Sequence, residues 1–169
     1  AAFLTAAMTI GSLSGVTVFA ADAGTDENVE MADASDVDGT TITFWHSMGG
    51  VNGEAIDTLV KKFNDENEYG ITVDAQYQGE YDDSLNKLKS AQIGNMGSDL
   101  VQVYEIGTRF MIDSGWIVPM QQMIDADSYD VSEIEPNLAA YYTIDNELYS
   151  MPFNSSTPIM YYNKDMFDK

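Results

Sequence analysis

The sequence predicts an α/β fold, in which a mostly parallel β-sheet carries helices on both faces. Short runs of β-branched and aromatic residues alternate along the chain with segments in which apolar residues recur every three or four positions. The 169 residues are also 44% hydrophobic and 11% aromatic, which is enough apolar material for a packed core. A series of strand, helix and strand requires parallel pairing with right-handed crossovers.

The first half of the chain carries the three predicted strands. A β-branched and aromatic run predicts a strand over residues 41–45, and a helical pattern over 53–67 follows it. Alternating apolar residues predict a second strand at 71–77, before a helix at 82–93. A third strand is expected at 99–104. These elements together form two strand–helix–strand units.

The rest of the chain predicts smaller elements. Short helical segments are expected at residues 107–114 and 119–125, and a longer one at 132–142. An extended pair at 147–152 and 157–162 completes the series.

The amino-terminal region predicts secretion. Residues 1–20 carry no charge, mix apolar with small residues and end in Val18-Phe19-Ala20, which suits a signal peptidase site. Because an initiator Met and a basic segment are missing, we expect the sequence to begin inside the signal peptide. Residues 21–39 hold seven acidic and no basic residues and predict a flexible, solvated leader. The expected location is periplasmic or extracellular.

Charge and composition exclude several classes of function. Seven Lys and Arg against 28 Asp and Glu give a formal charge of -21, which repels nucleic acid. The chain has no cysteine, so disulfides, thiolate metal sites and cysteine nucleophiles are excluded. His46 is the only histidine of the sequence, which excludes a multi-histidine zinc site. We expect no metal, no cofactor and a monomeric protein.

Three loops are expected to line one cleft. Ligands of open parallel sheets bind beyond the carboxyl ends of the strands, where loops converge and helix amino termini point backbone N–H groups outward. Polar and aromatic residues follow each predicted strand, at 46–50, 79–81 and 105–107. The sequence therefore predicts a small-molecule site at this edge of the sheet.

Three motifs carry a resemblance to a known family. FWHSM at residues 44–48, VYEIGT at 103–108 and PFNSSTPIMYYNKDMF at 152–167 resemble the extracellular solute-binding proteins of ABC importers, and among them the binders of glycerol 3-phosphate. The resemblance runs from about residue 41 to the end of the sequence. It implies a lobe of the type II periplasmic-binding-protein kind, which closes on its ligand like a hinge.

The resemblance also implies domain limits and site residues. Residues 40–162 correspond to the N-terminal lobe, and 163–169 to the start of a crossover into a second lobe, so the sequence is expected to be a fragment of a two-lobed protein. Tyr81, Glu105 and Ser156 fall on the family's ligand-contacting positions. Three residues after the first strand are weaker candidates for ligand contact: Trp45, His46 and Ser47.

Each of these residues also has a structural interpretation. Glu105 accepts hydrogen bonds from substrate hydroxyls or forms an ion pair with Arg109, four residues on. Tyr81 binds a polyol or packs on the core, and Ser156 binds a ligand oxygen or is an ordinary turn residue. For Trp45 and His46, a place in the core and a structural hydrogen bond are favoured over a direct role.

The function implied by the resemblance is capture without chemistry. Ligand binding closes the two lobes, and the closed form delivers glycerol 3-phosphate or a glycerophosphodiester to a membrane permease with its ATPase subunits. One alternative is a binder of oligosaccharides from the same family. Another is a secreted carbohydrate hydrolase, with Glu105 and Glu80 as its two carboxylates. A hydrolase requires both carboxylates to flank the scissile bond, and the sequence does not provide that geometry, so we expect a protein that is not an enzyme.

Overall fold

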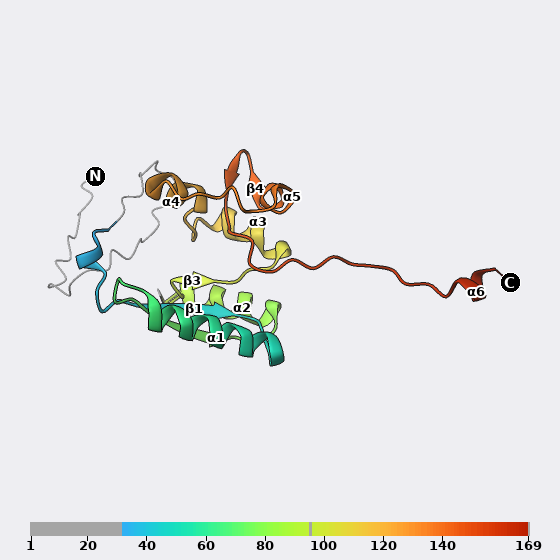
Figure 1. Ribbon diagram of the computed structural model, residues 1–169, viewed down its shortest axis with the longest axis horizontal. Coiled ribbons are helices and arrows are strands. Elements are labelled where there is room, and N and C mark those ends of the chain that lie inside the picture. Colours follow the sequence, from blue (N-terminus) through green and yellow to red (C-terminus); the bar gives the residue numbers. More distant parts are fainter. Residues whose placement is uncertain (1–31, 95, 169) are drawn as a thin grey trace, which may run out of the picture. The chain divides into compact units, whose positions relative to one another are not determined.

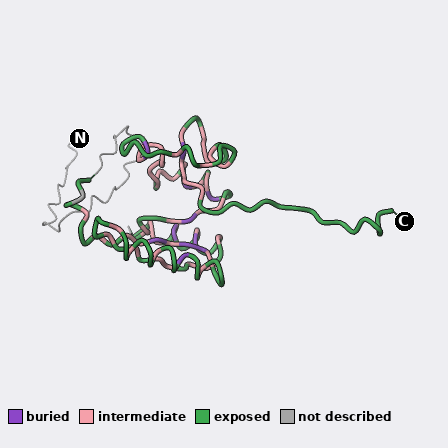
Figure 2. Tube along the Cα trace, viewed as in Figure 1, coloured by how far each residue is buried: buried purple, intermediate pink, exposed green. Residues whose placement is uncertain are grey.

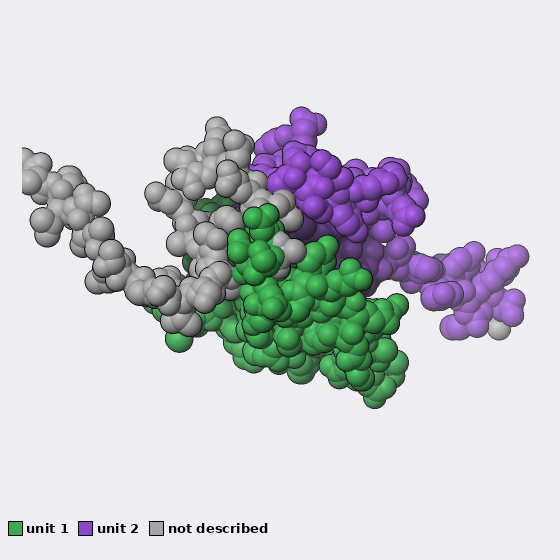
Figure 3. All heavy atoms as spheres, turned by 60° about the vertical axis from the view of Figure 1, so that its left-hand side comes forward, with its two compact units in different colours: residues 1–25, 30–116 green, residues 26–29, 117–169 purple. Residues whose placement is uncertain are grey.

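The computed structural model describes residues 32–94 and 96–168. These residues form two compact units that divide after Trp116, called unit 1 and unit 2 in chain order, and each is described by itself (Figure 3). The predicted signal peptide, 1–20, and the first part of the predicted leader, 21–39, lie outside the described residues. None of the described helices is long and apolar enough to cross a membrane.

Unit 1 is built on a three-stranded parallel sheet (Figure 1). The central strand is β1 (Thr41–His46), with β2 (Thr72–Tyr77) on one side and β3 (Leu100–Val101) on the other. β1 pairs with β2 along its whole length and with β3 at two positions. The predicted α/β fold with a parallel sheet is confirmed, as are the strands predicted at 41–45 and 71–77.

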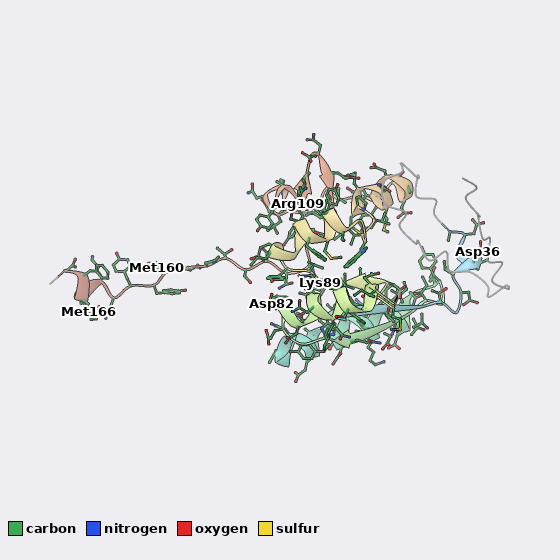
Figure 4. All side chains as sticks on the ribbon, turned by 180° about the vertical axis from the view of Figure 1, so that it is seen from behind. Asp36, Asp82, Lys89, Arg109, Met160 and Met166 are labelled. Carbon is green, nitrogen blue, oxygen red and sulfur yellow. The ribbon has the colours of Figure 1, made fainter. Side chains whose placement is uncertain are left out.

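Two long helices make the crossovers between these strands. α1 (Gly50–Glu66) connects β1 to β2, and α2 (Tyr81–Gln92) connects β2 to β3. The first crossover runs from β1 to one side, and the second runs back past β1 to the other side. With right-handed crossovers, this reversal puts the helices on opposite faces. α1 lies in front of the sheet in Figure 1, and α2 lies in front of it in Figure 4.

The first crossover helix begins three residues earlier than the predicted start at residue 53. Gly49 is the N-cap, and the Gly53 N–H donates to the Gly49 carbonyl over 3.3 Å. A Cβ at Gly53 would lie 2.8 Å from the Met48 carbonyl oxygen, so the first turn approaches the preceding loop more closely than any side chain allows. Gly50, which the sequence analysis placed in the loop 46–50, is therefore the first residue of α1.

The third strand is shorter than predicted, two residues in place of 99–104. Side chains replace backbone pairing at both of its ends. The Asp99 carboxylate accepts from the Thr43 N–H over 2.8 Å and from the Thr43 hydroxyl over 2.7 Å. Beyond β3, the Gln102 side-chain oxygen accepts from the Ser47 N–H over 2.9 Å. These bonds satisfy the β1 backbone where a longer ladder would have done so.

Two asparagines of the first crossover cover the outer edge of β2. Asn64 donates to the Val73 carbonyl over 3.0 Å and accepts from the Val73 N–H over 2.7 Å. Asn67 makes the same pair of bonds with Ile71, over 2.9 and 3.0 Å. Each amide side chain thus forms the two bonds that a neighbouring strand would form.

The core of unit 1 lies between the sheet and its helices. α3 (Glu105–Ser114) follows β3 and ends at Gly115, whose φ of 66° is the left-handed conformation usual after a helix. Its bounds confirm the helix predicted at 107–114. Figure 2 shows buried segments gathered on the sheet and the inner helix faces. The buried apolar side chains there come from β1, α1, α2 and α3: Phe44, Ile56, Leu88 and Met111. A single turn of 3-10 helix, Ala34–Asp36, precedes the sheet.

Unit 2 contains α4 (Met120–Asp127), α5 (Pro136–Tyr141), α6 (Lys164–Phe167) and a hairpin of β4 (Thr143–Ile144) and β5 (Glu147–Leu148). The helix predicted at 119–125 is confirmed by α4. The helix predicted at 132–142 begins only at Pro136, because proline suits the first helical turn and disfavours helix before it.

The extended pair predicted at 147–152 and 157–162 is not a pair of strands. β5 covers only the first two residues of the first segment and pairs with β4, to which the sequence assigned no element, and residues 151–163 form neither helix nor strand. Asp145 and Asn146 both have positive φ, 53° and 69°, as a two-residue hairpin turn requires. This Asp-Asn turn between β4 and β5 is the signal that the prediction missed. The predicted lobe limits, 40–162, stay a prediction.

Candidate ligand site

The loops after β1, β2 and β3 leave the sheet of unit 1 at its carboxyl edge. Backbone bonds tie them together: the Gln78 N–H donates to the His46 carbonyl and the Gln102 N–H to the Trp45 carbonyl, each over 2.8 Å. The direction of the crossovers reverses beside β1. Open α/β sheets bind ligands at such a reversal, because the loops on its two sides turn away to opposite faces and leave a crevice. The carboxyl edge is therefore the candidate site.

Tyr81 is the first residue of α2 and is half-buried. Its ring stacks on that of Tyr104, with centroids 5.3 Å apart and planes within 6° of parallel. The Tyr104 hydroxyl donates a hydrogen bond to Asp82, which lies in the first turn of α2 (Figure 4). Tyr104 thus connects the loop after β3 to the start of α2 through both its ring and its hydroxyl.

Glu105 is the first residue of α3, and its side chain is exposed. A carboxylate in the first turn of a helix is stabilised by the helix dipole. Arg109 forms its ion pair with Asp113, over 2.6 Å, which lies four residues further along α3. Because Glu105 directly follows Tyr104, the stack on Tyr81 brings Tyr81 and Glu105 to neighbouring positions of the same edge.

The bond to Asp82 affects the ionisation of Tyr104. It raises the pKa of Tyr104 above the usual 10.0, with smaller contributions from desolvation and from the charges of Asp82 and Glu105. The Tyr104 hydroxyl therefore stays protonated, and remains a donor, over the whole physiological pH range.

Buried polar groups lie at the end of β1. His46 is 3% exposed, Ser47 7% and Gln102 8%. The His46 Nδ1 accepts from the Met48 N–H over 3.3 Å. Burial lowers the pKa of His46 from the usual 6.5, against smaller opposing effects of the Asp57 charge and the Met48 bond. Among the described residues, the Ser47 hydroxyl is buried without a hydrogen-bond partner, which marks it as a group that a bound molecule could satisfy.

Trp45 and Ser156 are the remaining candidates from the sequence. The Trp45 indole N–H donates to the Gln76 side chain over 3.1 Å, across the β1–β2 pair, and Trp45 is half-buried rather than part of the buried core that was favoured for it. Ser156 is exposed and lies in unit 2, within the irregular stretch 151–163. A role for Ser156 in ligand binding stays a prediction.

The carboxyl edge is rich in negative charge. Glu80 is the N-cap of α2, Asp82 and Asp83 lie in its first turn, and Glu105 opens α3. Such a surface suits hydroxyl donors and disfavours an anion at close range. No group of three or more residues suited to hold a metal ion occurs in the described part of the chain.

A shallow groove of about 660 Å³ lies along α2, beside this edge. Its lining includes Gly79, Asp83, Lys87 and Met96, and the Lys87 ammonium donates to the Gln78 carbonyl over 2.8 Å. Tyr81 and Glu105 do not line it. Since an open groove encloses little of a small ligand, we place the site at the strand ends rather than here.

Sequence reasoning missed Tyr104 and Gln102 as parts of the edge. Tyr104 stands directly before Glu105, so its place at the end of the third strand could have been noted. Its stacking partner, Tyr81, lies 23 residues earlier in the sequence, at the start of α2. No local sequence pattern predicts a contact over that separation. Gln102 shows no signal, because its bond to the Ser47 N–H depends on the pairing of β1 with β3.

Comparison with known families decides the membership of the chain. The sequence model of the family of bacterial extracellular solute-binding proteins matches residues 58–169, which is more than half of this chain. The chain belongs to this family. The resemblance read from the three sequence motifs is thereby confirmed.

Curated relatives within the family bear names that specify a ligand. The sn-glycerol-3-phosphate-binding periplasmic protein UgpB of Salmonella typhimurium is 43% identical over 136 residues, which cover 77% of this chain and 30% of the relative. The UgpB protein of Escherichia coli K12 is 40% identical over 136 residues, with the same coverage. The chain thus spans about a third of the length of these relatives.

Solved structures of other binding proteins share the fold. The sugar-binding protein MalE of Xanthomonas citri superposes with a TM-score of 0.57 at 24% identity, covering 67% of this chain and 28% of that one. The cyclic α-maltosyl-1,6-maltose binding protein of Arthrobacter globiformis gives 0.55 at 21% identity, over 64% of this chain and 27% of its own. At these identities the likeness concerns the fold.

Proposed function

We propose that the protein captures glycerol 3-phosphate or a glycerophosphodiester outside the cytoplasm and delivers it to the permease of an ABC importer. The observation that carries this proposal is the identity of about 40% to proteins named as sn-glycerol-3-phosphate-binding. The geometry of the carboxyl edge supports it, since an exposed carboxylate and a held tyrosine ring suit the hydroxyl and C–H groups of a glycerol unit.

Each residue of the proposed site has a distinct role. The Glu105 carboxylate accepts hydrogen bonds from the two glycerol hydroxyls, and Tyr81 packs against the carbon chain. Ser156 donates to an oxygen of the same ligand, and the unpartnered Ser47 hydroxyl offers a further contact. Because Glu105 repels anions, the phosphate points away from it.

Capture proceeds by closure of two lobes on the ligand. The open form binds weakly, and contacts from both lobes form together only in the closed form, so the ligand shifts the population towards closure. A dissociation constant of the order of micromolar, about 8 kcal/mol, is what a few charge-assisted bonds and an aromatic contact supply.

No bond of the ligand is broken in this function. The family and the named relatives are described as binding proteins rather than enzymes. The carboxylates at the edge therefore serve recognition, and Glu80, the second carboxylate of the hydrolase alternative, is the N-cap residue of α2. Secretion by the signal peptide expected at 1–20 accords with the extracellular character of the family.

An oligosaccharide is the second candidate ligand. Glu80, Asp82, Asp83 and Glu105 give the edge a negative charge that suits an uncharged, hydroxyl-rich molecule better than a phosphate. The same tyrosine and carboxylate would bind sugar hydroxyls and a sugar face. The two ligands differ in one requirement: only a phosphate needs a cationic group in its binding site.

Calorimetry on the full-length protein tests the proposal. Glycerol 3-phosphate, glycerophosphocholine and maltooligosaccharides are titrated in turn, and we expect micromolar binding of a glycerol phosphate and none of the sugars. Binding of sugars alone would select the second candidate, and binding of neither class would refute the proposed function.

Replacement of Glu105 by Ala tests the role of the site. We expect binding to weaken by about 1.5–3 kcal/mol, as for loss of a charge-assisted hydrogen bond. Glu68→Ala is the matched control and should leave affinity unchanged. Glu68 lies in the exposed turn before β2, at the amino-terminal end of the strands. Equal affinities of the Glu105→Ala variant and the unmodified protein would remove Glu105 from the site.

A further inference from the structure

Tyr104 connects the segment after β3 to the first turn of α2. It is the N-cap residue of α3, at the end of the segment that follows β3. Its ring is stacked on Tyr81 at 5.3 Å, and its hydroxyl donates to Asp82. Tyr81 and Asp82 are the first two residues of α2. One side chain thus makes two different contacts with the same helix turn.

We propose that Tyr104 is a positioning residue of the ligand site, which fixes the Tyr81 ring beside Glu105 before the ligand arrives. The inference rests on the proposed function, because it assigns Tyr104 a part in the same site. Tyr104 contacts the ligand through Tyr81 rather than directly, since its ring lies against Tyr81 and its hydroxyl proton is directed to Asp82.

The start of the second crossover needs such support. Gly79, two residues before Tyr81, has a φ of 95°, a conformation that other residues rarely adopt, and the N-cap Glu80 makes no side-chain capping bond. The first turn of α2 therefore has no side-chain cap, and the bond from Lys87 to the Gln78 carbonyl restrains the preceding turn rather than the Tyr81 ring. The stack and the bond to Asp82 supply the restraint, and the two contacts act on adjacent residues.

Restraint of the Tyr81 ring affects affinity. A side chain that is ordered only on binding lowers the affinity by the entropy it loses, whereas one held in advance does not. Tyr104 also covers one face of Tyr81, so a ligand cannot stack on that face. The orientation in which a glycerol or sugar approaches Tyr81 is thus limited by Tyr104, which makes it a determinant of specificity as well.

The hydroxyl and the ring of Tyr104 can be tested separately. Tyr104→Phe keeps the stack and removes the bond to Asp82, while Tyr104→Leu keeps apolar volume and removes both. Asp82→Asn keeps an acceptor without the charge that raises the pKa of Tyr104. Tyr69→Ala is the matched control, because Tyr69 is 56% exposed in the turn before β2, at the opposite edge of the same sheet.

Affinity and thermal midpoint are measured for each full-length variant with the best ligand of the calorimetric panel. We expect Tyr104→Leu to weaken binding roughly two- to tenfold, as for loss of an aromatic pair, with Tyr104→Phe recovering most of it. The thermal midpoint without ligand should fall more in Tyr104→Leu than in Tyr69→Ala, because only the first variant removes contacts that restrain the start of α2. A spectroscopic titration should show one tyrosine ionising at lower pH in Asp82→Asn than in the unmodified protein.

The outcomes separate this inference from the proposed function. If the unmodified protein binds no member of the panel, the proposed function fails. If it binds, and Tyr81→Ala weakens binding while Tyr104→Leu does not, the positioning role alone is refuted. Equal weakening by Tyr104→Phe and Tyr104→Leu would refute the role of the ring, and equal weakening by Tyr69→Ala would refute any specific effect.

Discussion

The Ser47 hydroxyl is buried at the end of β1 and, among the described residues, has no hydrogen-bond partner. A buried hydroxyl without a partner costs free energy in the empty protein and regains it when a ligand atom satisfies it. A ligand hydrogen-bonding group that reaches Ser47 would satisfy this hydroxyl. Its backbone N–H, in contrast, is fixed by the Gln102 side chain.

Replacement of Ser47 by Ala should therefore act oppositely on stability and on binding. We expect the unfolding free energy without ligand to stay the same or rise by up to about 1 kcal/mol, because the unsatisfied group is removed. Affinity for the ligand should fall by about 0.5–1.5 kcal/mol. Chemical denaturation and calorimetry measure the two quantities. A variant with reduced stability and unchanged affinity would show that Ser47 serves the fold.

His46 gives the fold a pH dependence. Its pKa is lowered by burial, so near pH 6 the folded protein binds fewer protons than the unfolded chain. Stability should therefore fall as the pH drops below the ordinary value of 6.5. In His46→Asn, whose amide oxygen can still accept from the Met48 N–H, the thermal midpoint should change less between pH 7.5 and about 5.5. Parallel curves for the two proteins over that range would contradict this assignment.

Single residues were predictable where the chemistry is local. Tyr81 and Glu105 follow predicted strands, so the rule for parallel sheets placed both at one edge, and the structure puts them on neighbouring loops through Tyr104. The Tyr104 stack and the Gln102 bond could not be predicted, because each joins segments whose distance in space depends on strand order.

At the scale of elements, the edge strand β2 is protected by Asn64 and Asn67. Their side chains occupy the outward-facing N–H and carbonyl groups of Val73 and Ile71. Free groups of this kind pair with edges of other chains. The two asparagines therefore stabilise the unit and also limit self-association.

The double variant Asn64→Ala, Asn67→Ala tests both effects. We expect the unfolding free energy to fall by about 1–3 kcal/mol, since four hydrogen bonds are lost at a half-buried edge. Light scattering should show more self-association at high concentration than for the unmodified protein. Asn52→Ala, an exposed position in the first turn of α1, is the control. If the double variant is as stable as this control, the edge bonds do not contribute.

Element types were better predicted than element ends. The patterns at 41–45, 71–77 and 82–93 were long enough to specify strand, strand and helix. The strand at 99–104 was overestimated, because the side chains of Asp99 and Gln102 take over the pairing that the pattern assigned to the backbone. The hairpin of β4 and β5 was missed, since strands of two residues show no alternation.

At the scale of the whole molecule, the charge distribution bears on the ligand. Residues 40–169 hold 21 acidic and 7 basic residues, a formal charge of -14. Four of these acids lie at the carboxyl edge of unit 1. A phosphorylated ligand therefore requires cationic groups away from these four acids, whereas a sugar needs none. The fold class followed from periodicity, but the choice of ligand depends on groups that periodicity does not describe.

The central proposal is that Tyr81, Glu105 and Ser156 bind one ligand molecule. A crystal structure of the full-length protein with sn-glycerol 3-phosphate tests it most directly. We predict a Glu105 oxygen within about 2.6–3.2 Å of a glycerol hydroxyl, with Tyr81 and the Ser156 hydroxyl in contact with the same molecule and the phosphate on the side away from Glu105. A ligand bound elsewhere, or one whose phosphate lies against Glu105, would contradict the account.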